Sequence, residues 1–176
     1  PWSVSTAALY RELRRRLPAG EEAVLATIVD VKGSAYRRPG AKMLISPDGS
    51  LGAITAGCLE GPVADIASEV LEDGQPRVET FDLMDDTEWG LGLGCNGIID
   101  ILLEPVDGSL DEGLARLQDR ESIATLTAIE STDSAVAVGD RTVLDEDGDP
   151  LPTADRPSLP DALVEDLTSA VAELRR

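Results

Sequence analysis

The sequence predicts an α/β or α+β fold in which a mixed β-sheet is flanked by helices. Apolar, largely β-branched runs of strand length occur at residues 23–31 and 98–103. Apolar side chains recur at helical spacing in residues 59–73 and 161–175. Segments of the two kinds follow one another along the chain, which excludes an all-α or all-β protein.

The first half of the chain is expected to contain two helices and two strands. Ser5 can cap a helix that runs to about Leu17 and ends at the Pro18–Gly20 stretch. The β-branched strand at 23–31 and a short strand at 43–46 come next, with a turn at 47–50. The second helix carries a proline in its first turn, where proline is tolerated, and ends at Gly74. Its apolar stripe consists of Val63, Ile66, Ala67, Val70 and Leu71.

The second half is predicted from similar signals. Strands are expected at 78–83 and 98–103 on either side of an irregular stretch, 84–96, and the second of them is apolar enough to be central. A short helix at 110–120 precedes strands at 123–129, 135–138 and 142–144, the last two joined by a Gly139-Asp140 turn. The polar, proline-rich residues 145–160 are expected to be a loop or linker before the helix at 161–175. No internal repeat is visible.

The charge excludes several functions. The 176 residues include 34 acidic and 15 basic ones, a net charge of −19, which opposes binding to nucleic acids and to anionic membrane surfaces. The apolar runs are too short to cross a bilayer, so we expect a cytoplasmic protein. Only Lys32 and Lys42 are lysines and Asp outnumbers Glu, a composition that favours a halophilic cytoplasm at molar salt. The alternative is an ordinary acidic domain.

The chain has no histidine and two cysteines, Cys58 and Cys95. It therefore lacks the commonest general base and every Ser-His or Cys-His catalytic pair. Two cysteines alone cannot make a zinc-ribbon or iron–sulfur ligand set, and in a reducing cytosol they are expected to be free thiols.

Three glycine-rich segments are the candidates for function. The first, residues 33–41, follows a strand and contains Arg37 and Arg38, whose guanidinium groups suit phosphate or carboxylate. Its glycines allow backbone N–H groups to approach a ligand closely. The alternative is a surface loop with solvated arginines.

The second segment, residues 55–62, places Cys58 at or just before a helix N-terminus, which favours a thiolate able to act as a soft-metal ligand or nucleophile. Glu60 could accept a hydrogen bond or shuttle a proton. The alternative is a small buried cysteine beside an acid that complements the helix dipole.

The third segment, residues 89–97, has four glycines and Cys95 just before the central strand. Because it precedes a strand and does not join a strand to a helix, it does not match a dinucleotide-binding loop. It could also be a purely structural loop.

At these segments the sequence resembles the XdhC/CoxI family, accessory proteins of the molybdenum hydroxylases. The resemblance runs from about Val24 to Pro105, with Ala56 and Asn96 standing where family members usually have glycine. The residues that carry it are Gly33-Ser34, Arg37, Gly40-Ala41, Met43-Leu44, Gly57-Cys58-Leu59-Glu60, Gly92, Gly94-Cys95, Gly97 and Glu104-Pro105.

The resemblance implies an accessory maturation protein that binds molybdenum cofactor (molybdopterin), protects it and passes it to a xanthine dehydrogenase- or CO dehydrogenase-type apoenzyme. It further implies contact with a cysteine desulfurase and a homo-oligomer. Residues 1–150 would be the XdhC/CoxI-like N-terminal domain, and residues 151–176 a linker and helix before a Rossmann-like domain. The expected cofactor-binding residues are Gly33, Ser34, Arg37, Arg38, Gly40, Gly57, Cys58, Glu60, Gly92, Gly94, Cys95 and Gly97, with Cys58 and Cys95 as the candidates for the metal.

Two other functions stay open at this point. A thiol enzyme would use Cys58 and Cys95 for sulfur transfer or redox catalysis, with multiple turnovers through a persulfide or disulfide. A structural module would merely support a catalytic domain elsewhere. A cofactor chaperone, by contrast, binds stoichiometrically without turnover.

Overall fold

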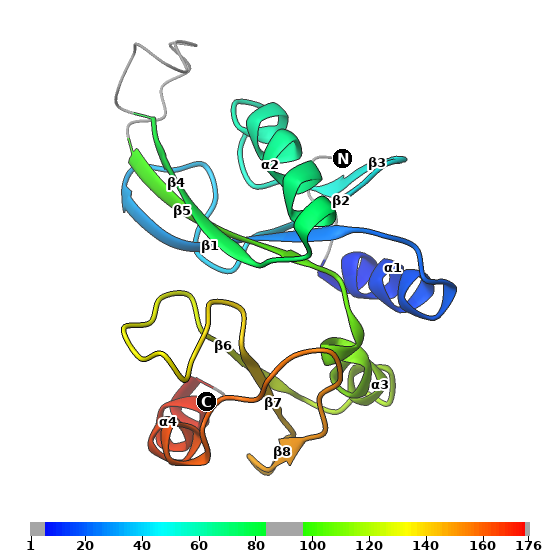
Figure 1. Ribbon diagram of the computed structural model, residues 1–176, viewed down its shortest axis with the longest axis vertical. Coiled ribbons are helices and arrows are strands. Elements are labelled where there is room, and N and C mark those ends of the chain that lie inside the picture. The colour runs from blue at the N-terminus through cyan, green and yellow to red at the C-terminus, as the bar shows by residue number, and fades with distance from the viewer. Residues whose placement is uncertain (1–5, 84–96, 175–176) are drawn as a thin grey trace. The chain divides into compact units, whose positions relative to one another are not determined.

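A computed structural model describes residues 6–83 and 97–174 of the chain, with side chains up to residue 168. The chain divides into two compact units, Pro1–Val106 and Asp107–Arg176, each with its own sheet (Figure 1). The predicted mixture of strands and helices is confirmed, and the strand pairs of both sheets are antiparallel. No helix in these two ranges is long and apolar enough to cross a membrane.

The first unit is built on a five-stranded sheet with the order β3-β2-β1-β5-β4. β1 and β5 pair along most of their length, so both are interior strands, as the apolar run at 98–103 predicts. The elements of this unit are α1 (Thr6–Ala19), β1 (Val24–Gly33), β2 (Lys42–Ser46), β3 (Gly49–Gly52), α2 (Glu60–Asp73), β4 (Arg77–Asp82) and β5 (Gly97–Pro105).

Alternation along the strands gives the sheet two different faces. One face packs against the apolar stripe of α2, with Val63, Ala67 and Val70 buried among side chains from β1, β2, β4 and β5. Leu44 of β2 points to the other face, where it lies beside Glu12 and Arg16 of α1. Residues 101–104 of β5 are buried in succession, as expected for a strand covered on both faces.

β3 is a strand where the sequence predicts only a connection. It pairs with β2 across the predicted turn, which places Pro47 and Asp48 at its tip. Gly52 explains the weak sequence signal: its φ is +93°, and a Cβ there would lie 2.6 Å from the carbonyl oxygen of Lys42. Glycine is needed at this position for close pairing, and glycine has no strand preference of its own.

The second unit holds a three-stranded sheet, β6-β7-β8, with helices at its ends. Its buried cluster consists of Leu144, Leu159 and Val164, with Leu126 and Val136 packed against it. The elements are a short 3₁₀ turn η1 (Gly108–Leu110), α3 (Asp111–Gln118), β6 (Ala124–Thr127), β7 (Arg141–Leu144), β8 (Pro150–Leu151) and α4 (Asp161–Leu174).

The strand predicted at residues 135–138 is wrong, because this stretch forms two turns. The side chain of Asp133 accepts a hydrogen bond from the amide of Ala135 (2.8 Å), and the side chain of Asp140 accepts one from Ala137 (2.8 Å). Aspartates that bond to nearby amides in this way compete with sheet formation. β7 consequently pairs with β6 directly.

Residues 145–160, expected to be a loop or linker, lie inside the second unit. They contain β8, and Leu151 and Leu159 are buried. Arg156 is tied to Asp107 at the start of the unit by an ion pair of 2.6 Å and donates to the carbonyl of Gly139 (3.2 Å). Two buried leucines and one paired arginine are enough to fold a stretch whose composition is otherwise that of a loop.

Candidate functional site

Pairing of β1 with β5 brings the first and third glycine-rich segments together. Gly33, the last residue of β1, is opposite Gly97, the first residue of β5. A Cβ at Gly97 would lie 2.7 Å from the carbonyl oxygen of Ser34 and 2.9 Å from that of Lys32. Gly97 therefore acts in the structure as a close-approach position, where the start of β5 touches the backbone on both sides of Gly33.

The loop after β1 folds back onto its own strand. The amide of Gly40 donates to the carbonyl of Ile28 (2.8 Å), and the amide of Ile28 donates to the carbonyl of Ala41 (3.0 Å). These bonds lie beside the bulge that interrupts the β1–β5 register between Ile28 and Asp30. Gly40 has a φ of +93°, a conformation that favours glycine. The loop is thus closed at its base.

Arg37 and Arg38 project from this closed loop. Arg38 is exposed and Arg37 half-buried, and neither guanidinium has a hydrogen bond or ion pair with any residue that the structure describes. Ala35 and Ala41 of the same loop pack against the core on the α2 face. The loop is therefore held by its small residues, and its two cations remain available to an anion.

The second segment leads into α2 and carries Cys58. This cysteine is a free thiol, half-buried, two residues before the first residue of the helix, as the sequence predicts. Gly57 has a φ of +113° and open space around it, so glycine is required there by conformation and not by crowding. Leu59, the N-cap residue, is fully buried and anchors the segment in the core.

Glu60 accepts hydrogen bonds, one of the roles that the sequence allows, and its partners lie in its own segment. Its carboxylate accepts hydrogen bonds from the amide of Thr55 (3.1 Å), the hydroxyl of Thr55 (2.6 Å) and the amide of Leu59 (3.2 Å). Thr55, which sequence reasoning did not single out, is buried and is the centre of this arrangement. The sequence signal for this hydrogen-bonded arrangement is a threonine five residues before a glutamate in the first turn of a helix.

The segments border one core. Leu59, at the start of α2, belongs to the buried cluster against which Ala35, Ala41 and Leu83 pack. The first and second segments thus pack against the same core, and Gly97, the described residue of the third segment, pairs with Gly33 of the first. Gly92, Gly94 and Cys95 lie outside the described residues, and so the arrangement of the two thiols stays a prediction. Within the described ranges, no three His, Cys, Asp or Glu side chains gather as a metal-binding group.

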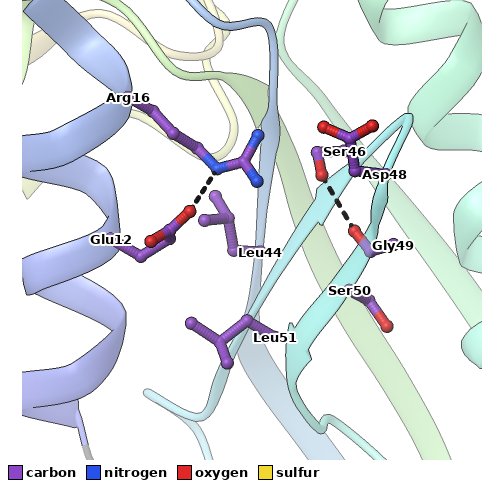
Figure 2. Close-up of a pocket in the computed structure, with 8 residues that line it drawn as sticks. All are labelled: Glu12, Arg16, Leu44, Ser46, Asp48, Gly49, Ser50 and Leu51. Carbon is purple, nitrogen blue, oxygen red and sulfur yellow. Dashed lines mark hydrogen bonds and ion pairs between the residues drawn. The ribbon is translucent and has the colours of Figure 1, made fainter.

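Two hollows are lined by residues outside these segments. Figure 2 shows the one in the first unit, about 220 Å³, between α1 and the β2–β3 hairpin. Arg16 faces it and is paired with Glu12 at 2.8 Å; hydrogen bonds from Arg15 hold the pKa of Glu12 below its usual range. An apolar groove of about 600 Å³ in the second unit includes the exposed side chains of Ile129 and Leu163. No predicted site residue lines either hollow.

Comparison with known proteins matches two of the three site segments to a family model. The model of the XdhC and CoxI family matches residues 17–82, a range that contains the whole first and second segments. A probable xanthine dehydrogenase subunit of Bacillus subtilis (strain 168) is 44% identical over 89 residues, 49% of this chain and 27% of that protein. The molybdenum cofactor insertion chaperone PaoD of Escherichia coli (strain K12) is 32% identical over 111 residues, 61% of this chain and 34% of PaoD.

A solved structure is similar over a longer range. The crystal structure of a protein described as a xanthine dehydrogenase from Bacillus halodurans superposes with a TM-score of 0.68 and 33% identity, and covers 85% of this chain and 45% of that one. The present chain accordingly spans less than half the length of each of these three proteins. Residues 17–82 of this chain match the model of the XdhC and CoxI family, and the similar fold of the solved structure agrees with that match.

Proposed function

We propose that this chain binds molybdenum cofactor and delivers it to a molybdenum hydroxylase of the xanthine dehydrogenase or CO dehydrogenase type. The observation that carries the proposal is the Gly33–Gly97 pairing, which joins two glycine-rich segments next to two arginines that have no ion pair within residues 6–83 and 97–174. The similarity to a named cofactor insertion chaperone, over 111 residues of this chain, supports the same function.

The chemistry of the cargo suits these residues. A pterin dithiolene cofactor presents a phosphate, a hydrogen-bonding pterin and a thiophilic metal centre. Arg37 and Arg38, with the N–H groups of the glycine loops, would hold the phosphate by charge-assisted hydrogen bonds. The half-buried thiol of Cys58 is the described group with the softness to approach molybdenum. A carrier must also release its cargo, which a site formed by surface loops with few ligands permits.

The partners follow from this function. The receiver would be a molybdenum hydroxylase apoenzyme, and the supplier of the terminal sulfido ligand a cysteine desulfurase. The proposal includes that the protein acts in the cytoplasm and assembles as a homo-oligomer. A Rossmann-like domain beyond residue 176 is part of it as well.

Equilibrium titration tests the proposal. The full chain, in molar KCl, is titrated with molybdenum cofactor released from a donor enzyme, and bound pterin is measured by its fluorescence after acid oxidation. We expect a single saturable site and a stoichiometric complex. Absence of saturable binding in high salt would contradict the proposal. Low salt is unsuitable, because unscreened repulsion at a net charge of −19 destabilises the fold.

Cys58→Ser separates carrying from catalysis. We expect this variant to keep its circular dichroism spectrum and to lose cofactor affinity, because serine is a poor ligand for a soft metal. Repeated turnover of a sulfur donor by the parent chain, with a trapped persulfide on Cys58 or Cys95, would instead identify a thiol enzyme.

A further inference from the structure

Thr55 and Glu60 form a closed group of hydrogen bonds around the turn that carries Cys58. The hydroxyl of Thr55 donates to Glu60 Oε2 (2.6 Å) and accepts from the amides of Gly57 (3.3 Å) and Leu59 (3.3 Å). Glu60 Oε1 accepts from the amide of Thr55 (3.1 Å), and Oε2 also accepts from the amide of Leu59 (3.2 Å). We call this group the Thr55–Glu60 clasp.

The clasp closes a turn whose two ends are already anchored. Ile54 and Leu59 are both fully buried in the core, and Thr55 itself is 3% exposed. Between these anchors Ala56 and Gly57 are exposed and Cys58 is half-buried. The buried ends fix where the turn begins and finishes, and the clasp fixes the path of the backbone between them.

The carboxylate of Glu60 uses its hydrogen-bonding capacity within the Thr55–Glu60 clasp. It accepts three hydrogen bonds, all from its own segment, and it is the first residue of α2, where the helix dipole also favours a negative charge. Turning it toward a ligand would leave the buried Thr55 hydroxyl and the Leu59 amide without this acceptor, which is costly.

We infer that Glu60 is a positioning residue, which acts through Thr55 on the backbone of residues 55–59 and so sets the place and exposure of the Cys58 thiol. This differs from direct contact of Glu60 with the cargo or proton transfer by it. The consequence for cofactor affinity rests on the proposed function. The consequence for the turn does not.

Amide hydrogen exchange and thiol alkylation measure the clasp without any cofactor. In Glu60→Gln the side-chain NH₂ cannot accept a hydrogen bond, so one of the donors of Thr55 and Leu59 loses its acceptor. We expect exchange of the amide that then faces the NH₂ group, that of Thr55 or that of Leu59, to quicken about tenfold or more, the scale of one lost charge-assisted bond. In a Cys95→Ser background, iodoacetamide should react faster with Cys58 as the turn opens.

Three variants control this experiment. Thr55→Val removes the hydroxyl and should reproduce the effects of Glu60→Gln, whereas Thr55→Ser keeps the hydroxyl and should restore the exchange and alkylation rates of the parent. Asp65→Asn neutralises an exposed acid of the same helix for which no hydrogen bond or ion pair is described, and should change neither rate. Unchanged exchange of both the residue-55 and the Leu59 amides in Glu60→Gln and in Thr55→Val would overturn the inference.

A double-mutant cycle on cofactor affinity separates positioning from contact. If Glu60 acts through Thr55, the Thr55→Val/Glu60→Gln double variant binds cofactor no more weakly than the weaker single variant. If Glu60 contacts the cofactor, the two losses multiply, and the inference is wrong. Should the parent bind no cofactor at all, the proposed function fails while the exchange and alkylation rates still decide whether the clasp exists.

Discussion

Arg37 and Arg38 have no acidic partner among the described residues, in contrast to five other arginines of this chain. Arg15, Arg16, Arg77, Arg116 and Arg156 each form an ion pair with a carboxylate. In a chain with a net charge of −19, two neighbouring cations that have no ion pair among the described residues are candidates to bind an external anion.

Arg37→Ala tests this capacity at the scale of one residue. We expect it to weaken cofactor binding by about 1.5–3 kcal/mol, the worth of a hydrogen bond to a charged group, with an unchanged circular dichroism spectrum. Arg11→Ala, which removes an exposed arginine of α1, is the matched control and should bind as the parent does. Normal binding by Arg37→Ala would mean that Arg38 or backbone amides, and not Arg37, hold the phosphate.

Glu60 shows where prediction from sequence stops at this scale. Its position at the start of a helix and beside Cys58 could be predicted from the glycine, proline and apolar spacing around it. The direction of its carboxylate could not, because that depends on the left-handed backbone at Gly57 and on the burial of Thr55, which only the folded turn determines.

Among the elements, the β1–β5 pair gives the sharpest test of a glycine. Gly97→Ala places a methyl group 2.7 Å from the carbonyl oxygen of Ser34 and 2.9 Å from that of Lys32, so the backbone must shift to admit it. We expect a loss of about 1–3 kcal/mol in the free energy of unfolding, as for other overpacked sites. Urea unfolding followed by circular dichroism measures it.

Gly61→Ala is the matched control for this substitution. Gly61 lies in the first turn of α2 with nothing within 4 Å of its Cβ position, and alanine favours helix. The variant should be as stable as the parent or slightly more so. If Gly97→Ala were equally harmless, the two strands would have to be able to separate at Gly33, and the close approach of the two glycine-rich segments would not be needed for folding.

A helix or strand could be predicted where the signals in its own residues agreed with the contacts that it makes in the folded chain. α2 combined an apolar stripe with a left-handed glycine at its end, Gly74, and was predicted almost to the residue. β3 was missed because it is extended through its pairing with β2, which its own residues do not indicate. The false strand at 135–138 had β-branched residues, but the side chains of Asp133 and Asp140 turned the backbone.

At the scale of the whole molecule, charge dominates. Both units carry exposed acids, and several of those on helices, including Asp65, Glu72 and Glu165, have no described partner. Repulsion among like charges destabilises the compact state and acts over about 10 Å at 0.1 M salt, but only about 3 Å at 1 M. Stability should therefore rise with ionic strength.

Thermal unfolding in KCl measures this dependence. We expect the Tm to rise by at least about 5 °C between 0.1 M and 1 M KCl, a change that corresponds to about 2 kcal/mol in a chain of this length. The exposed ion pairs, such as that of Arg15 with Glu21, weaken over the same range, but each contributes little. The loss of repulsion is thus expected to outweigh them.

A triple variant shows whether screening is the cause. Asp65→Asn, Glu72→Gln and Glu165→Gln each remove one negative charge, so the net charge changes from −19 to −16. The variant should unfold at a higher temperature than the parent in 0.1 M KCl, and the difference should vanish at 1 M, where the parent's repulsion is already screened. An equal rise with salt in both chains would mean that KCl stabilises this protein by ion binding or exclusion from its surface, and the acidity would then have no part in its salt response.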